Sequence, residues 1–348
     1  MQKTNQVLDE LFMQRCFDLA RLGAGHVAPN PLVGAVLVYN GRIIGEGWHQ
    51  KYGYAHAEVN ALKSVREEER CLVPDSTLYV SLEPCNIHGN TPPCTDLILR
   101  NKIKKVVISC IDHTPGVKGR GVALLEQAGV EVVHSVLEEK GRKISAFRNT
   151  FTALERPYIQ LKFARTPNGF MGKPGEQVWI SNSFSKRLAH KIRSHYDAIL
   201  VGTQTALIDN PALTNRLWSG KSPLRIVLDK TLKVPTSHTI FNKAAKSWVI
   251  TELPVPVHED HLTYHCLAFD DLLPDNLLKL LAAHRVTSLI IEGGAFTLNQ
   301  FISKNLWDEA WIFTGERLIE NGIPAPTLFG QEIAHHKIGS DMLTILKR

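Results

Sequence analysis

Residue types that bind metal ions gather between positions 54 and 94. The stretch begins Y-A-H-A-E-V-N-A-L and ends L-E-P-C-N-I-H-G-N-T-P-P-C. His56, Cys85 and Cys94 offer one imidazole and two thiolates, a set of donors that suits zinc. Three protein ligands leave the fourth tetrahedral position free for water, whereas a structural site fills it with protein. The pattern therefore predicts a catalytic zinc site.

Glu58 lies two residues beyond His56, where it can stand beside the metal without binding it. Zinc lowers the pKa of bound water to about 7, and a nearby carboxylate can carry protons to the attacked ring and the departing ammonia. His-x-Glu alone, or one Cys before a helix, often has no function. H-A-E followed by E-P-C and P-P-C is more specific and indicates a zinc deaminase.

Composition narrows the class of protein. The 348 residues favour two domains, and the net charge of +6 comes from basic residues that are mostly dispersed. We therefore expect a small anionic ligand such as a phosphate ester and no nucleic-acid partner. Six scattered cysteines, two of them assigned to metal, fit a reducing cytoplasm. No signal peptide or membrane span is evident, so we expect a cytoplasmic protein without a membrane partner.

Residues 1–150 alternate between apolar strands and amphipathic helices. The Asn-Gly pair at 40–41 predicts a type I′ hairpin, and the turns at 84–85 and 92–94 are each expected to lead into a helix. The alternation predicts a three-layer α/β sandwich whose latter half is largely parallel. We expect helices at 8–22, 55–65, 95–100 and 122–128, and strands at 33–38, 42–45, 77–81, 106–109 and 131–133.

Residues 151–348 start a second α/β alternation without an internal repeat of the first, so we expect two different domains. Gly293 and Gly294 follow an apolar strand, where backbone N–H groups can approach a phosphate or simply make a tight turn. Asp209 before Asn210-Pro211 is equally open to both interpretations. We expect strands at 159–163, 178–180, 198–202, 224–228, 247–251 and 288–291, and helices at 184–196 and 272–284.

Nearly the whole chain resembles the bifunctional deaminase/reductase family of riboflavin biosynthesis. Its deaminase motifs are similar to A-P-N-P-L-V-G-A-V-L-V, G-W-H-Q-K-Y-G-Y-A-H-A-E and D-H-T-P-G-V-K-G-R-G, besides the stretch above. Its reductase motifs are similar to L-K-F-A-R-T-P-N-G, D-A-I-L-V-G-T-Q-T-A-L-I-D-N-P-A-L-T-N-R and I-E-G-G-A. The resemblance implies a cytidine-deaminase-like α/β/α domain at 1–150 and a dihydrofolate-reductase-like α/β domain at 151–348.

The resemblance also implies two successive reactions on one phosphorylated pyrimidine. The first domain would deaminate a diaminohydroxyphosphoribosylaminopyrimidine hydrolytically with Zn²⁺. The second would use NADPH to reduce the opened ribose of the aminouracil product, giving the ribitylamino phosphate. Enzymes of this kind are commonly oligomers, so we expect several copies of the chain to assemble.

Site residues of the family map onto this chain one by one. The resemblance implies that Glu58 carries protons beside the three zinc ligands. Further positions that line the pyrimidine or ribose-phosphate pocket are Asn30, His49 and Asp112. Substrate-binding positions of the reductase are Arg193, Leu213, Arg216 and Glu292. Its cofactor-binding positions are Trp179, Thr205, Asp209, Gly293 and Gly294.

Several positions depart from the family pattern. The family often has Lys or Arg at Asn90, so we expect this phosphate contact to be absent or to come from a residue such as His88. The reductase motif Ser-x-Asp-Gly-Lys here reads Thr-Pro-Asn-Gly-Phe, so Asn168 and Phe170 replace two charged residues, and the sequence does not fix whether the reductase is fully active. Lys230 replaces a common Ser, and we predict that Lys230 reaches the extra phosphate of NADPH.

Two alternatives compete with this interpretation. A nucleoside or tRNA deaminase, with an inactive or nucleotide-binding second domain, would typically carry Pro-Cys-x-x-Cys. Here eight residues separate Cys85 from Cys94, and a whole domain follows. A structural-zinc module that binds a nucleotide would need neither an open coordination position nor the spare carboxylate of Glu58.

Overall fold

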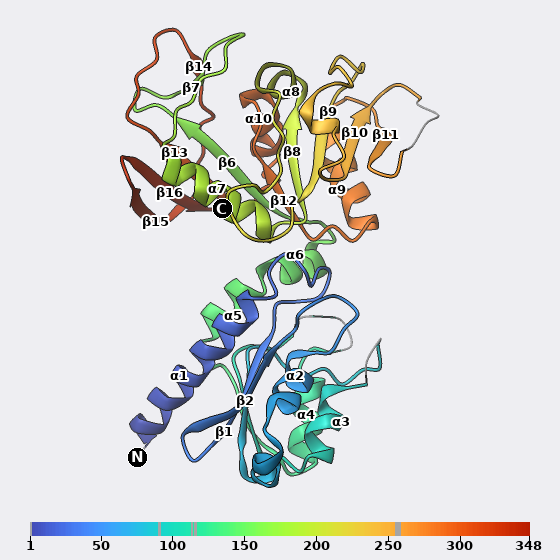
Figure 1. Ribbon diagram of the computed structural model, residues 1–348, viewed down its shortest axis with the longest axis vertical. Helices are drawn as coiled ribbons and strands as arrows, with labels where there is room; N and C mark the ends of the chain where they lie inside the picture. Colours follow the sequence, from blue (N-terminus) through green and yellow to red (C-terminus); the bar gives the residue numbers. More distant parts are fainter. Residues whose placement is uncertain (1, 90–91, 113, 115–116, 255–258) are drawn as a thin grey trace. The chain divides into compact units, whose positions relative to one another are not determined.

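The computed structural model divides the chain into two compact units, Met1–Glu155 and Arg156–Arg348 (Figure 1). The structure describes residues 2–89, 92–112, 114, 117–254 and 259–348. The division falls close to the domain boundary expected after residue 150. Each unit has its own sheet and its own apolar core.

The first unit is built on a five-stranded sheet with the order β2-β1-β3-β4-β5. β1 runs antiparallel to β2 and β3, whereas β3, β4 and β5 are parallel, as the sequence predicts. The strands are β1 (Gly34–Tyr39), β2 (Arg42–Trp48), β3 (Thr77–Val80), β4 (Lys105–Ile108) and β5 (Glu131–Val133).

Helices cover both faces of this sheet, which confirms the three-layer α/β/α architecture. On one face, apolar side chains of α1 pack on β1 and β3. On the other face, α2, α3 and α4 pack on the same strands and on β4. The helices are α1 (Gln2–Arg21), α2 (Ala57–Ser64), α3 (Cys94–Arg100), α4 (Arg120–Gln127), α5 (Glu138–Ile144) and α6 (Ala146–Leu154), with a 3₁₀ segment at Glu67–Asp75.

The hairpin between β1 and β2 follows from two residues. Asn40 has a φ of 48° and Gly41 a φ of 74°, both in the left-handed region that a type I′ turn requires. Asn and Gly adopt this region at low cost, and the turn fits the right-handed twist of the strands that it joins. The predicted hairpin is therefore confirmed.

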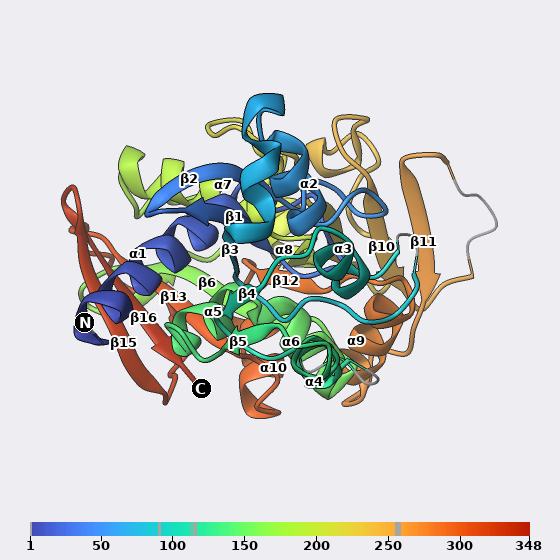
Figure 2. The same cartoon turned by 90° about the horizontal axis from the view of Figure 1, so that it is seen from below.

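The second unit contains a nine-stranded sheet with the order β11-β10-β9-β8-β12-β6-β13-β16-β15. The strands from β11 to β13 are parallel, and β16 and β15 add an antiparallel edge at the opposite end from β11 (Figure 2). The strands are β6 (Tyr158–Arg165), β8 (Ala198–Gly202), β9 (Leu224–Leu228), β10 (Ser247–Thr251), β11 (Leu262–Cys266), β12 (Ser288–Ile291), β13 (Glu309–Thr314), β15 (Gln331–Ile338) and β16 (Asp341–Lys347).

Helices also cover this second sheet. α9 and α10 pack on the strands of its parallel part, and Leu188 of α7 packs near β13 and β16. The helices are α7 (Ser183–His195), α8 (Thr203–Asp209), α9 (Leu273–Ala283) and α10 (Ala295–Ser303), with a 3₁₀ turn at Thr239–Phe241. A separate two-stranded ribbon pairs β7 (Phe170–Gly172) with β14 (Ile323–Pro324).

One predicted strand is wrong. Residues 178–180 form no strand but lead directly into α7, whose N-cap Asn182 accepts a hydrogen bond from the Ser185 N–H. The place of this apolar segment in the α/β alternation predicted a strand, but among the described residues it has no partner strand to complete a hydrogen-bond ladder. In the part of the chain that the structure describes, no helix is both long and apolar enough to span a membrane.

Candidate zinc centre and reductase pocket

The three expected zinc ligands meet in the first unit. His56 is the N-cap of α2, Cys94 is the first residue of α3, and Cys85 lies in the irregular segment after β3. Cys94 therefore opens a helix as predicted, whereas Cys85 does not. The His56 Nδ1 atom lies 3.5 Å from the Cys85 Sγ atom and 3.4 Å from the Cys94 Sγ atom.

This spacing fits a tetrahedral zinc ion. Zinc bonds of about 2.0 Å to nitrogen and about 2.3 Å to sulfur place the two ligand atoms about 3.6 Å apart. The three donor atoms lie within 4.8 Å of one another, and they form the one such group of three or more among the described residues. The donor set and its geometry both suit zinc.

The start of α3 favours a thiolate at Cys85. The Cys94 N–H points at the Cys85 Sγ atom over 3.4 Å, and the Thr95 N–H donates to the Cys85 carbonyl oxygen. Hydrogen bonding from the Cys94 side chain, together with that from His56, lowers the pKa of Cys85 to about 4. A thiolate is the form that binds a metal.

Glu58 stands beside these donors. It belongs to the first turn of α2, its side chain is buried, and it is in hydrogen-bonding reach of Cys94. Burial raises the pKa of Glu58 above its ordinary value, because an ionised carboxylate loses hydration inside the protein. A buried carboxyl group with a raised pKa holds a proton more readily than an exposed one, which suits a group that must take up and then release protons.

A cavity of about 340 Å³ opens onto the zinc ligands. His49 is buried, and its Nδ1 atom lies 3.0 Å from the Ala55 carbonyl oxygen while its Nε2 atom lies 3.2 Å from Asn30 Nδ2. Other residues that line the cavity include Glu58, Asp112, Thr114 and Arg148. Asn30, His49 and Asp112 therefore share one cavity with the zinc ligands.

The structure describes His88 but not Asn90, the two residues linked to phosphate recognition. His88 is exposed, and its neighbours Ile87 and Gly89, not His88 itself, line the cavity. Asn90 lies outside the described residues, so the expected change in phosphate recognition at this position stays a prediction.

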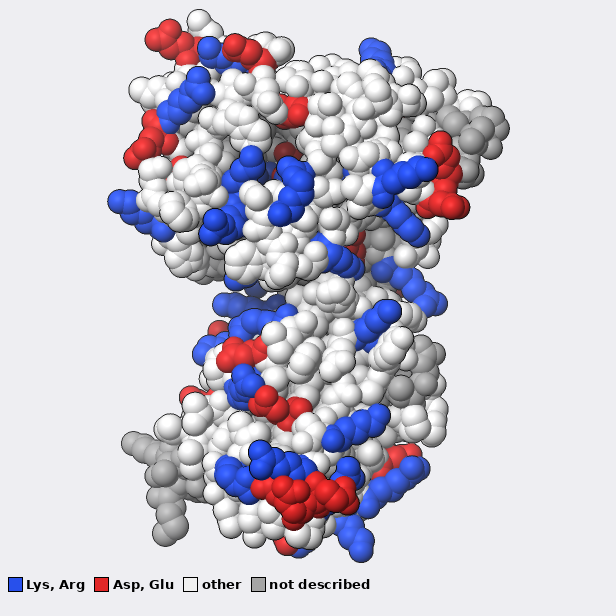
Figure 3. All heavy atoms as spheres, viewed as in Figure 1, with Lys and Arg blue, Asp and Glu red and all other residues white. Residues whose placement is uncertain are grey.

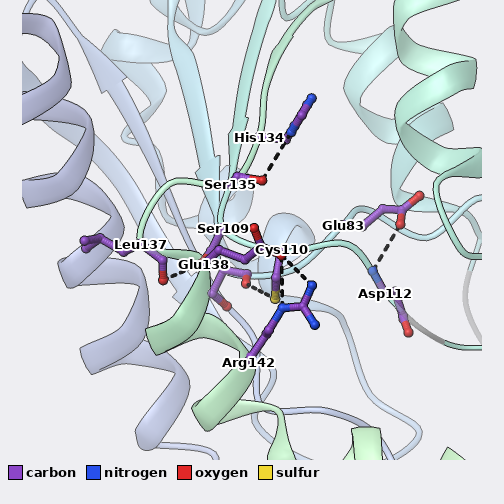
Figure 4. A network of polar contacts seen from close by, with 10 residues as sticks. Glu83, Ser109, Cys110, Asp112, His134, Ser135, Leu137, Glu138 and Arg142 are labelled. Carbon is purple, nitrogen blue, oxygen red and sulfur yellow. Dashed lines mark hydrogen bonds and ion pairs between the residues drawn. The ribbon is translucent and has the colours of Figure 1, made fainter. Parts of the chain in front are cut away.

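Glu83 is a site residue that the sequence interpretation missed. Its buried carboxylate accepts four backbone N–H groups, from Asp112 (3.1 Å), Gly119 (2.9 Å), Gly121 (2.8 Å) and Val122 (3.3 Å). Figure 4 shows Glu83 turned toward Asp112. Glu83 thus ties the segment before Cys85 to the start of α4 and to the cavity wall. Its position two residues before the zinc ligand Cys85 was the sequence feature that could have identified it.

A buried ion-pair group forms the centre of the second unit. Arg193 of α7 makes two parallel hydrogen bonds to Glu292, of 3.0 and 2.7 Å. Lys162 of β6 lies 3.9 Å from the same carboxylate. Burial alone would raise the pKa of Glu292, but Arg193 and Lys162 outweigh it and lower that pKa to about 2.

Lys162 is the second residue that the sequence interpretation missed. Its side chain is largely buried in the sheet, and burial lowers its pKa because the ammonium loses hydration. A single cation inside the apolar run L-K-F-A was the signal that could have found it. Parallel pairing of β6 with β12 explains the contact, since Ile291 pairs with Leu161 and the next residues are Glu292 and Lys162.

The other expected substrate-binding residues lie around Arg193. The Arg216 N–H donates to His190 Nδ1, and the Arg216 guanidinium donates to Thr214 Oγ1. Burial lowers the pKa of His190 to about 4, so its ring stays neutral and can accept that bond at neutral pH. Leu213 is buried with a φ of 50°, which places it in a sharp turn before Thr214.

The expected cofactor residues lie at the carboxyl ends of parallel strands. From β8 the chain adds β9, β10 and β11 in turn toward one edge of the sheet. It then crosses back and places β12 on the other side of β8. Ligands of open α/β sheets bind at such a switch point. Thr205 and Asp209 belong to α8 after β8, Lys230 follows β9, and Gly293 and Gly294 follow β12.

The glycine turn needs both of its glycines. A Cβ atom on Gly293 would lie 2.7 Å from Val201 Cβ. Gly294 has a φ of 66° and forms the N-cap of α10, and Thr205 Oγ1 lies 3.3 Å from where its Cβ would be. Close packing against β8 and α8 therefore accounts for both glycines, and the approach of a phosphate to this turn stays a prediction.

Trp179 and Lys230 are less enclosed. Trp179 is 59% exposed, and the Lys186 ammonium lies 4.2 Å from its ring centre. Lys230 is paired with Glu252 at 3.3 Å. The structure therefore places Trp179 and Lys230 on the surface of the second unit and gives each a partner already.

Residues 166–170, whose sequence differs from the family's Ser-x-Asp-Gly-Lys motif, form a hydrogen-bonded turn. Asn168 accepts a hydrogen bond from Thr166 Oγ1 and donates one to the Ile319 carbonyl oxygen over 2.8 Å. The Phe170 N–H donates to Thr166 Oγ1. Neutral hydrogen bonds thus hold this turn without the two charges that the family often has.

A second cavity, of about 580 Å³, lies at the start of α7 and is lined by Lys186, Arg187 and Trp218, among others. Lys and Arg side chains gather over α7 (Figure 3). α7 contains four Lys or Arg residues and no Asp or Glu. This helix is thus one of the small basic groups in a chain whose other basic residues are mostly dispersed.

Comparisons with known proteins agree with these two sites. Residues 6–110 match the family described as the cytidine and deoxycytidylate deaminase zinc-binding region, and residues 157–338 match the RibD C-terminal domain. The fold and the sites thus define a two-domain enzyme, a zinc-dependent deaminase followed by a reductase. The chain belongs to the RibD family of riboflavin biosynthesis proteins.

Individual relatives cover almost the whole chain. The riboflavin biosynthesis protein RibD of Aquifex aeolicus is 36% identical over 98% of this chain and 99% of its own. That of Escherichia coli is 32% identical over 89% of this chain and 88% of its own. The crystal structure of a diaminohydroxyphosphoribosylaminopyrimidine deaminase/5-amino-6-(5-phosphoribosylamino)uracil reductase from Thermotoga maritima superposes with a TM-score of 0.91 at 34% identity, covering 99% of both chains.

Proposed function

We propose that the chain catalyses two consecutive steps of riboflavin biosynthesis. The first unit removes an amino group from diaminohydroxyphosphoribosylaminopyrimidine, and the second reduces 5-amino-6-(5-phosphoribosylamino)uracil with NADPH. The observation that carries the first step is the convergence of His56, Cys85 and Cys94 beside the buried Glu58 at a cavity. Neither a structural-zinc module nor a nucleoside deaminase accounts for both units together.

In the first unit, His56, Cys85 and Cys94 would hold zinc, which supplies an activated water when bound. Glu58 would take one proton from the water and give it to the ring nitrogen, then take the proton of the hydroxyl added to the ring and give it to the amino group that leaves as ammonia. Its raised pKa suits both directions of transfer. The buried, neutral His49 donates through Nδ1 to Ala55, so its Nε2 accepts from Asn30 and holds that side chain in place.

In the second unit, NADPH supplies a hydride when bound at the turn formed by Gly293 and Gly294. Arg193 is already joined to Glu292 by two hydrogen bonds, so we assign it to positioning that carboxylate. The exposed Arg216 is the better candidate for the substrate phosphate. Lys162 Nζ, with its lowered pKa, can give the proton that the reduced sugar requires.

Lys230 is our candidate for recognising the extra phosphate of NADPH. It follows β9 at the cofactor edge, and its side chain is 52% exposed. Binding of a phosphate would exchange the Glu252 carboxylate for a group of higher charge. We expect Lys230→Ala to lower the NADPH-over-NADH preference in kcat/KM about tenfold or more, the loss of one charge-assisted contact. An unchanged preference would remove this assignment, and Lys233→Ala is the matched control.

The setting of the enzyme is also part of the proposal. Thiolates at Cys85 and Cys94 must stay reduced to bind zinc, which favours the cytoplasm. Assembly of several copies and the absence of a nucleic-acid partner stay predictions.

One assay tests the proposed function as a whole. It follows ammonia release and NADPH consumption on the phosphorylated pyrimidine, and ammonia without later NADPH consumption would contradict the second step.

A further inference from the structure

We propose that Arg148 binds the phosphate group of the deaminase substrate. This inference rests on the proposed function and names a specificity-determining residue at that same site. Arg148 belongs to α6, more than fifty residues beyond the last zinc ligand, yet it lines the same cavity as Glu58 and the zinc ligands His56 and Cys85.

The hydrogen bonds of Arg148 leave donors available for a ligand. Its guanidinium donates to Thr114 Oγ1 over 3.2 Å, and Thr114 Oγ1 in turn donates to Asp112 Oδ1 over 2.6 Å. The Arg148 Nε atom is buried and has no hydrogen-bond partner among the described groups. A buried N–H of a charged group is costly to leave unpaired, so a small turn of the side chain that brings this donor to an acceptor of the substrate would be favourable.

The charge of the cavity points to the same residue. Among the described residues that line it, Arg148 is the single Lys or Arg, while Glu58, Glu83 and Asp112 are acidic. Both ring nitrogens of His49 are already engaged, by the Ala55 carbonyl oxygen at 3.0 Å and by Asn30 Nδ2 at 3.2 Å. A phosphate monoester carries about −1.5 to −2 charges at pH 7, and a guanidinium matches its oxygens with two parallel hydrogen bonds.

Neighbouring groups hold Arg148 in position for this role. The four N–H groups that surround Glu83 already satisfy that carboxylate, so it does not compete for the guanidinium. Within the described part of the chain, no Asp or Glu oxygen lies within 4.0 Å of an Arg148 nitrogen. Thr114 therefore orients the guanidinium through a neutral contact and leaves its positive charge for the ligand.

The test compares Arg148→Gln, Arg148→Lys and the control Arg66→Gln, an exposed arginine outside the cavity. We expect Arg148→Gln to raise KM for ammonia release about 10- to 100-fold on the phosphorylated substrate, with kcat changed less than about threefold. On the substrate without its phosphate, KM should be the same as in the wild type. Arg148→Lys should recover part of the loss, because it keeps the charge but not the fork.

Zinc content and melting temperature of each variant separate binding from a structural role, since both should match the wild type. The proposal is wrong if Arg148→Gln leaves KM unchanged, or raises it equally with and without the phosphate. A direct readout is titration calorimetry with ribose 5-phosphate, in which Arg148→Gln should bind one molecule fewer per chain than the wild type. This stoichiometry tests Arg148 even if ammonia release itself were absent, so the failure of one proposal is distinct from that of the other.

Discussion

Burial decides what individual carboxylates can do in this protein. Glu58 has a raised pKa because it is buried with few compensating charges. Glu292 is buried as well, but Arg193 and Lys162 reverse the effect and lower its pKa. Two glutamates of the same chain therefore serve opposite purposes, one as a proton carrier and the other as a permanent anion.

Replacing Glu58 separates metal binding from proton transfer. We expect Glu58→Gln to keep wild-type zinc content, because Glu58 is not among the three donors. Ammonia release should fall about 10²- to 10⁴-fold, the range for loss of a general acid-base group. Zinc analysis and ammonia assay on one preparation measure both. Equal rates in variant and wild type would remove Glu58 from the mechanism.

The pH dependence of stability reports the state of Glu292. Its folded pKa of about 2 lies below the ordinary 4.5, so the ionised group stabilises the fold fully above pH 4.5. That contribution is lost as the pH falls from 4.5 toward 2. We expect the difference in unfolding free energy between wild type and Glu292→Gln to be constant from pH 7 to about 5 and to shrink below it. Denaturant unfolding at several pH values measures it.

A matched control for this pH series is Glu176→Gln. Glu176 is exposed and paired only loosely, with Lys173 at 3.7 Å. Its difference from wild type should stay near zero at every pH, since exposed pairs contribute little. If the Glu292 variant showed the same flat curve, Glu292 would not be a strongly paired buried anion.

At the scale of elements, the ends of strands and helices bring the active groups together. The first residues of α2 and α3 supply His56, Glu58 and Cys94, while Glu83 fixes the start of α4. Backbone hydrogen bonds fix the ends of these elements, and His56, Glu58 and Glu83 also line the cavity that a ligand would enter. Such positions combine rigidity with access, which a binding or catalytic site requires.

Glu83→Gln tests the link between Cys85 and α4. Four backbone N–H groups would lose a charged acceptor, and the new amide N–H₂ would face donors. We expect the first unit to lose about 2–4 kcal/mol of stability, since charged hydrogen bonds contribute about 1.5–3 kcal/mol each and some rearrangement compensates. Thermal unfolding of the variant measures the loss. The exposed Glu126→Gln on α4 should show none, and a similar loss there would contradict the assignment.

On the scale of the whole molecule, the chain combines two chemistries that do not share residues. The zinc ligands and the first cavity belong to the unit Met1–Glu155, and the Arg193–Glu292 pair belongs to Arg156–Arg348. Each unit has its own core. Loss of one site should therefore leave the other intact.

Metal removal tests this independence. We expect a chelator to abolish ammonia release and added zinc to restore it, because the first site depends on the metal. NADPH oxidation with the deaminated product as substrate should continue at its original rate. Parallel loss of both activities would show that the second unit depends on the metal site.

Local chemistry made much of the protein predictable from sequence. Asn40-Gly41 specified the hairpin because both residues accept positive φ, and the spacing of His56, Cys85 and Cys94 indicated zinc because few other functions require those donors. The alternation of apolar strands and helices predicted the first sheet and five strands of the second, but not β11, β13, β15 and β16. These features depend on residues close in the chain or on their chemical type alone.

Only the tertiary structure decided which distant residues became partners. Glu83 accepts hydrogen bonds from residues about thirty to forty positions away, and Lys162 meets Glu292 across paired strands. Residues 178–180 form no strand, since no strand in the described part of the chain pairs with them. Partners of this kind arise from packing, which sets burial and therefore pKa and charge. The sequence by itself determined the donors and the two-domain α/β plan, whereas folding determined which charges are buried, paired or left for a ligand.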